Sequence, residues 1–426
     1  MQATPRPWKD SLDHRALYRL PWTLSDNVIA WLEPTWECNL SCEGCYRANV
    51  AQHKSLDEVR HEMEVFEKAR TFDSVSIAGG DPLLHPQIVD IVRLVAERGH
   101  KPILNTNGLA LTDDKLIEEL KRAGLAGFTF HIDSKQNRPG WKKKDEVALN
   151  ELRLSFAERI ARIGGLVCSF NSTVYEDTLE QVPDLVQFAQ DHIDVVNIMV
   201  FITLRGALLD GEFDYFHGGK KIDAEPLKYA VDEPRQRMDI SSREVVAKIR
   251  ERFPDFSPAA YLGGTEKPDS LKWLLTGRVG TPGKIFGYAG PRVIELGQTG
   301  HHAMFGTYMG YLSPSLIHGG KLMFALSPFD AGIRAAAGAW ARHVARNPLR
   351  ARDAVHFQSI MVIQPIDLLP DGRQNMCDGC PDITVHDGQL VWSCRLDECL
   401  QYGTFIQTVP KKAAEEVVSL RSKASA

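Results

Sequence analysis

The chain has 426 residues, 43% of them hydrophobic and 25% charged, which is typical of a globular protein with two or three domains. A formal net charge of -5 gives no basic field and so indicates no nucleic-acid partner. Residues 1–27, an N-terminal extension, contain no apolar segment like that of a signal peptide, and no run of about 18 apolar residues predicts a membrane-spanning helix. We therefore expect a cytoplasmic protein.

Residues 28–205 alternate short apolar runs with helical periods. The first helix begins after Ser55, where Glu58 three residues on completes a capping box. Strands are predicted at 28–33, 75–78, 101–108, 127–134, 166–175 and 195–203, and a helical segment follows each of the first five. This alternation predicts an α/β fold, a parallel sheet with helices outside it in the form of a partial barrel. Ligands of such sheets gather at the carboxyl ends of the strands.

Residues 206–375 are predicted to be an insertion that covers the substrate. The stretch 296–320 has no Asp, Glu, Lys or Arg, and its apolar side chains are expected either to wall a substrate pocket or to belong to a second core. An alanine-rich helix follows near 329–347, and its arginines either face anionic lipid or form a solvated helix face. The side chains concerned are Phe305, Tyr308, Tyr311, Leu312, Arg334, Arg342 and Arg346.

Three cysteines, Cys38, Cys42 and Cys45, lie within eight residues of the loop that follows the first strand. An odd set cannot close into disulfides among its own members, and seven of the eight cysteines of the chain lie in two tight groups. Three thiolates on one loop can hold three irons of a cubane and leave the fourth iron open to another ligand. The loop therefore predicts a metal centre with an open position.

The C-x3-C-x2-C spacing of these cysteines after the first strand resembles the radical SAM superfamily, and the resemblance covers residues 28–205. It implies a partial (β/α)6 barrel and a [4Fe–4S] cluster whose open iron binds S-adenosylmethionine (SAM). It further implies reductive cleavage of SAM to a 5′-deoxyadenosyl radical and a flavodoxin- or ferredoxin-type electron donor.

The ends of the other strands supply further candidates for binding the cofactor. The glycines of "GGDP" occupy the place of the family's "GGE" motif, and they permit the close backbone approach of a small ligand. His131 and Asp133 share a face of the fourth strand by its period of two and form the preferred pair. The full set of expected cofactor-binding residues is Tyr46, Gly79, Gly80, Asp81, Pro82, Asn105, Asn107, His131, Asp133, Ser134, Asn171 and Thr173. The alternative for each of them is a helix cap or a turn.

Residues 376–426 are predicted to form a metal-binding module and a charged C-terminal helix within a mixed α+β extension. Cys377, Cys380, Cys394 and Cys399 have the spacing C-x2-C-x13-C-x4-C, and "HDG" between the pairs predicts a hairpin. Such a set can hold zinc in a ribbon or a four-cysteine [4Fe–4S] cluster, and the resemblance favours an auxiliary cluster. Cys168 stands alone and is expected to be a buried structural thiol.

We predict a radical SAM enzyme that acts on a hydrophobic small molecule such as a lipid or an isoprenoid. "GGDPLLHP", "NTNG" and "FHIDS" together resemble radical SAM enzymes of hopanoid lipid biosynthesis, which implies such a substrate. The arginines of the alanine-rich helix would add a peripheral membrane contact. A peptide-modifying radical SAM enzyme is one alternative, and a non-catalytic iron–sulfur or zinc protein, such as an electron carrier or a scaffold, is another.

Overall fold

The computed structural model describes residues 12–205, 207–208, 213–224, 227, 230–231 and 237–411. The charged helix expected near the C-terminus lies outside the described residues. The domain boundaries expected at 28, 206 and 376 stay a prediction.

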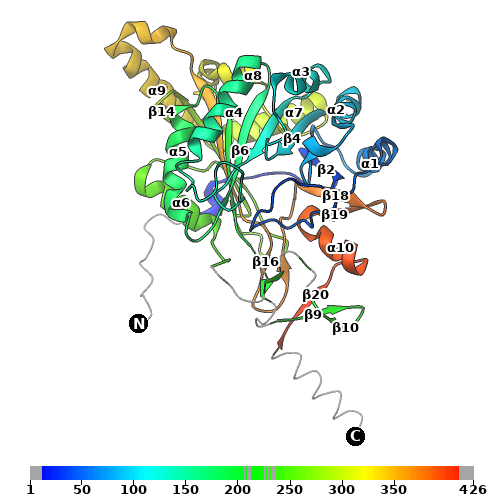
Figure 1. Cartoon of the computed structure of the whole chain (residues 1–426). Coiled ribbons are helices and arrows are strands. Elements are labelled where there is room, and N and C mark those ends of the chain that lie inside the picture. The colour runs from blue at the N-terminus through cyan, green and yellow to red at the C-terminus, as the bar shows by residue number, and fades with distance from the viewer. Residues whose placement is uncertain are drawn as a thin grey trace.

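Six parallel strands form the half of the sheet that the sequence predicts. They are β2 (Ile29–Thr35), β3 (Ser74–Gly79), β4 (Lys101–Thr106), β5 (Gly127–His131), β6 (Val167–Val174) and β7 (Ile198–Thr203). Each pairs in parallel with the next along the chain, so all six carboxyl ends meet at one edge, here called the carboxyl edge. This order confirms an α/β fold with a partial barrel of parallel strands (Figure 1).

Helices follow successive strands and cover the outside of this sheet. They are α1 (Leu56–Ala69), α2 (Ile88–Glu97), α3 (Asp114–Arg122), α4 (Asn150–Ile163) and α5 (Val182–Asp191), with the short 3-10 turns η2 (Pro82–Leu84) and η3 (Leu179–Gln181). Ser55 and Glu58 form the expected capping box of α1, in which each side chain receives a backbone N–H of the other.

The sheet continues beyond the six predicted strands. β15 (His356–Ile363) pairs in parallel with β7, and β13 (Trp273–Thr281) runs antiparallel to β15. β12 (Ala260–Leu262), β14 (Lys284–Tyr288) and β1 (Tyr18–Arg19) complete an eleven-stranded sheet. Strands from both ends of the sequence therefore join the barrel sheet, while α6 (Ser242–Arg252) packs against α5.

A helical layer lies at the opposite edge of the parallel strands, here called the amino edge. It contains α7 (Pro291–Phe305), α8 (Pro314–His318), η4 (Gly320–Leu326), α9 (Ala331–Arg346) and η5 (Pro348–Arg352). Gly310 N donates to Asp73 at 3.0 Å, just before β3, and Gly320 N donates to Val355 O at 2.8 Å, just before β15. Of the described helices, none has both the length and the apolar character needed to cross a membrane.

The charge-free stretch 296–320 lies in this layer, away from the cysteine loop. Tyr308, Tyr311 and Leu312 pack against buried apolar clusters, as the second-core alternative requires. Phe305 is 67% exposed and walls no pocket, so that expectation is wrong for it. The physical reason is that the stretch closes the amino edge, whereas the predicted cofactor site is at the carboxyl edge.

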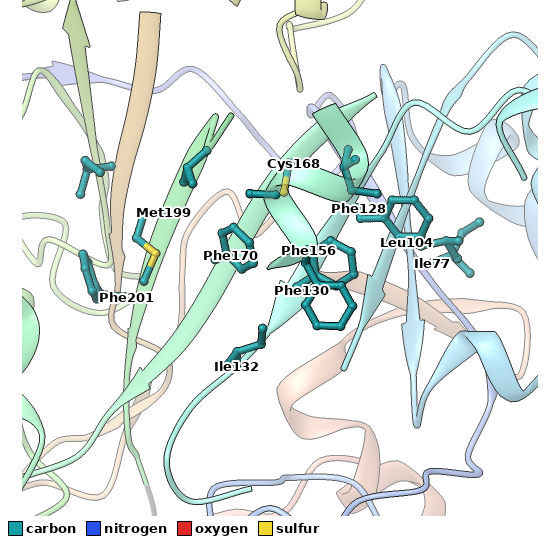
Figure 2. Packing of buried hydrophobic residues seen from close by; sticks show 14 of the residues in the cluster. Ile77, Leu104, Phe128, Phe130, Ile132, Phe156, Cys168, Phe170, Met199 and Phe201 are labelled. Carbon is teal, nitrogen blue, oxygen red and sulfur yellow. The ribbon is translucent and has the colours of Figure 1, made fainter. Parts of the chain in front are cut away.

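The core fills the space between the sheet and its outer helices. Phe130 is fully buried and stacks on Phe156 at 4.5 Å between ring centroids, with Phe128 and Phe170 beside it (Figure 2). Cys168 lies in the same cluster, and burial raises the pKa of its thiol, which confirms a structural cysteine. The apolar side chains of the strands thus face outward, and their alternate residues face the barrel lumen.

A smaller part of the described chain lies below the barrel in Figure 1. The expected hairpin, β18 (Ile383–His386) and β19 (Gln389–Trp392), lies beside β2 and α1 at the side of the barrel, with Asp387 and Gly388 at positive φ in its turn. It leads into η6 (Ser393–Arg395) and α10 (Leu396–Tyr402). The short strands β16 (Asp367–Leu368), β17 (Gln374–Asn375), β8 (Ala207–Leu208), β11 (Ala230–Val231), β9 (Phe213–His217), β10 (Lys220–Ile222) and β20 (Gln407–Pro410) form three further small sheets.

Candidate metal and cofactor site

The first three cysteines lie on a loop at the carboxyl edge, directly after β2. Asn49 fixes the backbone of Cys38 from both sides, accepting from its N at 2.9 Å and donating to its O at 2.7 Å. Burial raises the pKa of Cys38 and of Cys42, and the charge of Cys45 adds to both shifts, so the three thiols are neighbours. Because a bound metal needs thiolates, loading this loop should release protons.

Gly79 and Gly80 form a cradle against this loop. Gly80 N donates to Thr35 O at 2.8 Å, and Asp81 N donates to Glu37 O at 2.7 Å. A Cβ atom on Gly79 would lie 2.3 Å from Thr35 O, and one on Gly80 would lie 2.1 Å from Glu37 O. The two glycines are therefore required for the cysteine loop to approach β3 at all.

Replacing Gly80 with alanine is expected to push the cysteine loop off the end of β3 and to lower the iron bound by the loop, since the clash is with backbone that cannot rotate away. Iron content after anaerobic reconstitution measures the effect. Gly300→Ala is the matched control, because a Cβ there meets nothing within 4 Å. Equal iron in the Gly80 variant and the wild type would show that the cradle is not needed.

The Asp81 carboxylate forms its hydrogen bonds with other residues of the protein. Its carboxylate is fully buried and accepts from Leu83 N at 3.0 Å, from Asn107 N at 2.9 Å and from Thr106 Oγ1 at 2.8 Å. It caps η2, whose first residue is Pro82, and ties the end of β3 to the end of β4. The Asp81 carboxylate thus acts as a helix cap, which is the alternative to cofactor binding. Cofactor binding by the backbone of Asp81 and Pro82 stays a prediction.

His131 and Asp133 meet as the period of two predicts. His131 Nε2 lies 2.9 Å from Asp133 Oδ2 and 3.1 Å from Thr173 Oγ1, so three expected residues form one hydrogen-bonded group. His131 is partly exposed at the carboxyl edge, whereas Asp133 is buried. The backbone N of Ser134 instead donates a hydrogen bond to Glu146 Oε1 at 2.6 Å, which is a contact within a loop.

The remaining candidates divide between the loop and the lumen. Asn107 Nδ2 donates to Asn39 Oδ1 at 2.6 Å and lies 3.8 Å from Cys38 Sγ, so it holds the cysteine loop. Asn105 pairs across β4 and β5 with Thr129, and Asn171 pairs with His131, which places Asn105 and Asn171 on the lumen face. The Nδ2 of Asn105 is buried without a hydrogen-bond partner among the described residues, as a ligand-binding group would be.

Two further residues of the site were missed in the sequence. Arg138 is buried and donates to Asn107 O at 2.8 Å, and its charge acts on Cys42 and Asp133. Tyr175 follows β6, and its hydroxyl would lie 2.7 Å from a Cβ on Gly44. No spacing rule marks either residue, because each reaches the loop only through the folded sheet.

The distal cysteines are only partly brought together. Cys377, Cys380 and Cys394 act on one another electrostatically, and burial raises the pKa of Cys394 to about 12. Cys399 packs instead with Val391 and Leu396. Cys399 lies in α10, and its place as the fourth ligand stays a prediction.

Two buried arginines join the barrel to this distal module. Arg47, two residues after Cys45, binds both carboxylate oxygens of Glu33 at 2.6 and 2.8 Å and donates to Ser393 O at 2.5 Å. Arg70 donates to Cys380 O at 2.7 Å. Each guanidinium therefore holds the backbone at or beside a distal cysteine, and Tyr46 lies against Arg47, 4.8 Å from ring centroid to guanidinium carbon.

The arrangement of the first three cysteines is compatible with a cluster. Within the described ranges, no three Cys, His, Asp or Glu side chains lie close enough to share one metal ion. In a cubane each thiolate binds a different iron, so its ligands need not converge on one point. Together with the glycine cradle and the unpartnered Asn105 amide, this fits a cluster on Cys38, Cys42 and Cys45 with a ligand beside it.

Comparisons with known proteins agree with this geometry. Residues 32–189 match the family model of the radical SAM superfamily. The AdoMet-dependent heme synthase of Methanosarcina barkeri is 28% identical over 189 residues, which are 43% of this chain and 53% of that protein. The probable GTP 3′,8-cyclase of Methanocaldococcus jannaschii is 26% identical over 178 residues, 41% and 59% of the two chains. SuiB of Streptococcus suis, solved with bound S-adenosylmethionine, has 16% identity and a TM-score of 0.38, covering 54% of this chain and 48% of that one.

The matched part of the chain spans about half the length of the heme synthase and of the GTP 3′,8-cyclase.

Proposed function

Because residues 32–189 form a radical SAM domain, we propose that the chain is an enzyme that cleaves SAM reductively and acts on a hydrophobic small molecule. The superfamily uses a [4Fe–4S] cluster and SAM, which together supply a 5′-deoxyadenosyl radical when they are bound. Cys38, Cys42 and Cys45 are the residues that would hold the cluster, and Gly79 and Gly80 keep their loop at the end of β3.

The division of the lumen into a polar and an apolar half carries the proposal. The inward positions of β3 to β6 are mostly polar, among them Ser76, Asn105, Thr129, His131, Asn171 and Thr173. The inward positions of β7 and β15 are mostly apolar, namely Ile198, Val200, Ile202, Met361 and Ile363. The polar half suits the ribose and amino-acid groups of SAM, and the apolar half suits a hydrophobic substrate beside it.

The polar residues have distinct tasks in this proposal. His131, held by Asp133 and Thr173, stands at the mouth of the lumen and can donate or accept a hydrogen bond there. Tyr311 closes the other end, where Ser76 and Thr129 are near enough to its hydroxyl to influence its pKa. A site sealed at one end keeps water from a radical reaction. The proposal includes a flavodoxin- or ferredoxin-type electron donor and peripheral membrane contact.

Cleavage of SAM tests the proposal that the chain is an enzyme. Reduced protein reconstituted without oxygen should convert SAM to 5′-deoxyadenosine or to an adenosylated product, and the Cys38→Ala, Cys42→Ala, Cys45→Ala triple variant should not. Cys168→Ala is the control, because that thiol is buried in the core away from the loop. Wild-type protein that carries its cluster but never binds SAM would support the non-catalytic alternative instead.

The substrate class needs its own readout. Anaerobic incubation with cell extract should change a mass in the organic-solvent fraction if the substrate is hydrophobic. A change confined to peptides would assign the chain to the peptide-modifying alternative.

A further inference from the structure

The amino edge has an excess of positive over negative charge because it is nearly free of acidic residues. Between residues 296 and 352 there are six lysines and arginines and one acidic residue, in a chain whose net charge is -5. That acidic residue, Asp330, is buried as the N-cap of α9 and accepts from Ile333 N at 2.9 Å and Gly290 N at 3.0 Å. The outer surface of residues 296–352 therefore has no carboxylate of its own, and Asp353, just beyond it, balances only Arg350.

Most of these cations have no protein partner. Arg350 pairs with Asp353 at 3.1 Å, and Lys321 donates to Ala351 O at 2.8 Å. The other four are exposed and form no ion pair or side-chain hydrogen bond with any residue in the described part of the chain. They are Arg334, Arg342, Arg346 and Arg352. Four unpaired guanidinium groups over two adjoining helical segments form an anion-attracting field.

Exposed apolar side chains lie among these arginines. Leu349 is 73% exposed, Leu322 69% and Phe329 60%, and in the described residues seven of the twelve large apolar side chains that are exposed fall within 296–352. Lys321, beside Leu322, reaches Ala351 near Leu349, so η4 and η5 present these leucines together. The packing of η4 on α9, with Phe324 and Trp340 5.3 Å apart, adds the helix arginines to the same region.

We infer that this surface, defined by the four arginines together with Leu322, Phe329 and Leu349, docks the protein on an anionic phospholipid membrane. Arginines beside protruding leucine and phenylalanine are what an interfacial helix uses, since cations bind lipid headgroups and apolar side chains enter the acyl boundary. Nucleic acid would use the charge but leave the leucines in water. The inference deepens the peripheral membrane contact of the proposed function and does not depend on radical chemistry.

The docking surface also sets an orientation. In Figure 1 α7, α8 and α9 lie on the opposite side of the barrel from β16, α10 and β20. The cysteine loop follows the carboxyl end of β2, whereas α8 and η4 precede the amino end of β15. A protein docked in this way turns its cofactor site away from the bilayer, so the membrane positions the enzyme and does not feed the lumen directly.

Vesicle flotation tests the inference with the full chain. Wild-type protein should float with vesicles of phosphatidylcholine containing phosphatidylglycerol, and not with pure phosphatidylcholine. Each arginine near the surface contributes about fivefold to binding, so changing all four to glutamine should weaken it by about two orders of magnitude or more. The Leu322→Ser, Leu349→Ser variant should keep binding at low salt and lose it at high salt.

The control changes four exposed arginines elsewhere to glutamine, namely Arg93, Arg122, Arg162 and Arg373, and should float like the wild type. Failure of the wild type to bind anionic vesicles, as expected if the surface docks an acidic protein, overturns the inference. Equal losses in the test and control variants also overturn it. SAM cleavage is measured on the same preparations without lipid, so loss of the proposed activity is distinguished from loss of docking.

Discussion

Replacing Arg47 with methionine is expected to lower the free energy of unfolding by about 3 to 5 kcal/mol, because it leaves the buried carboxylate of Glu33 without its partner. Both side chains are almost completely buried, and Arg47 also holds Ser393 O. We expect the distal module to detach from the barrel before the barrel itself unfolds. Urea unfolding followed by tryptophan fluorescence measures the loss, and Trp392 beside Ser393 reports on the module.

Two companion variants separate the effect of the buried ion pair from the effect of the hydrogen bond to Ser393. Arg60→Met removes an exposed pair with Asp57 and should cost less than about 1 kcal/mol. Changing Glu33 to leucine together with Arg47 to methionine removes both buried charges, and should recover much of the stability but not the link to Ser393. An Arg47→Met protein as stable as the Arg60 variant would disprove the structural role assigned to Arg47.

Wild-type protein is expected to bind about eight irons, and the triple variant of Cys38, Cys42 and Cys45 about four, by four irons per [4Fe–4S] centre. The reason is that two separate cysteine groups each have cluster-like spacing. Changing Cys377, Cys380 and Cys394 to alanine should give the reciprocal loss. Iron and zinc are measured by metal analysis after anaerobic reconstitution.

The same measurement distinguishes a zinc ion from an iron–sulfur cluster at the distal cysteines. About four irons and one zinc in the wild type would establish a ribbon and remove the auxiliary cluster. Cys399→Ala separates the two ligand sets further, since a four-cysteine centre loses metal in that variant. A centre held by the other three cysteines does not.

Local chemistry explains which parts of the fold could be predicted from the sequence. The six strands follow from apolar runs, the start of α1 from its capping box, and the β18–β19 hairpin from its turn residues. The pairing of His131 with Asp133 follows from strand periodicity alone. The start of α3 follows a similar local rule, since Asp113 caps it and its carboxylate accepts from Lys115 N at 3.0 Å.

Contacts between distant segments could not be predicted in this way. β15 joins β7 although more than 150 residues separate them, and no local pattern records such a partner. Arg47 and Arg70 have no local sequence pattern that predicts burial, and each is held by the backbone of the folded distal module. The position of residues 296–320 could not be predicted either. Their lack of charge indicates burial or a pocket equally well, and it does not show at which edge of the barrel they pack.

The bond between Arg47 and Ser393 joins residues 346 positions apart, and this distance sets an order of events during synthesis. At roughly 5 to 20 residues per second, Arg47 leaves the ribosome about 20 to 70 s before Ser393. For that interval the cysteine loop is attached to a barrel that has no distal module against it. A cluster that binds Cys38, Cys42 and Cys45 would therefore have about 20 to 70 s to reach the loop before Ser393 binds Arg47.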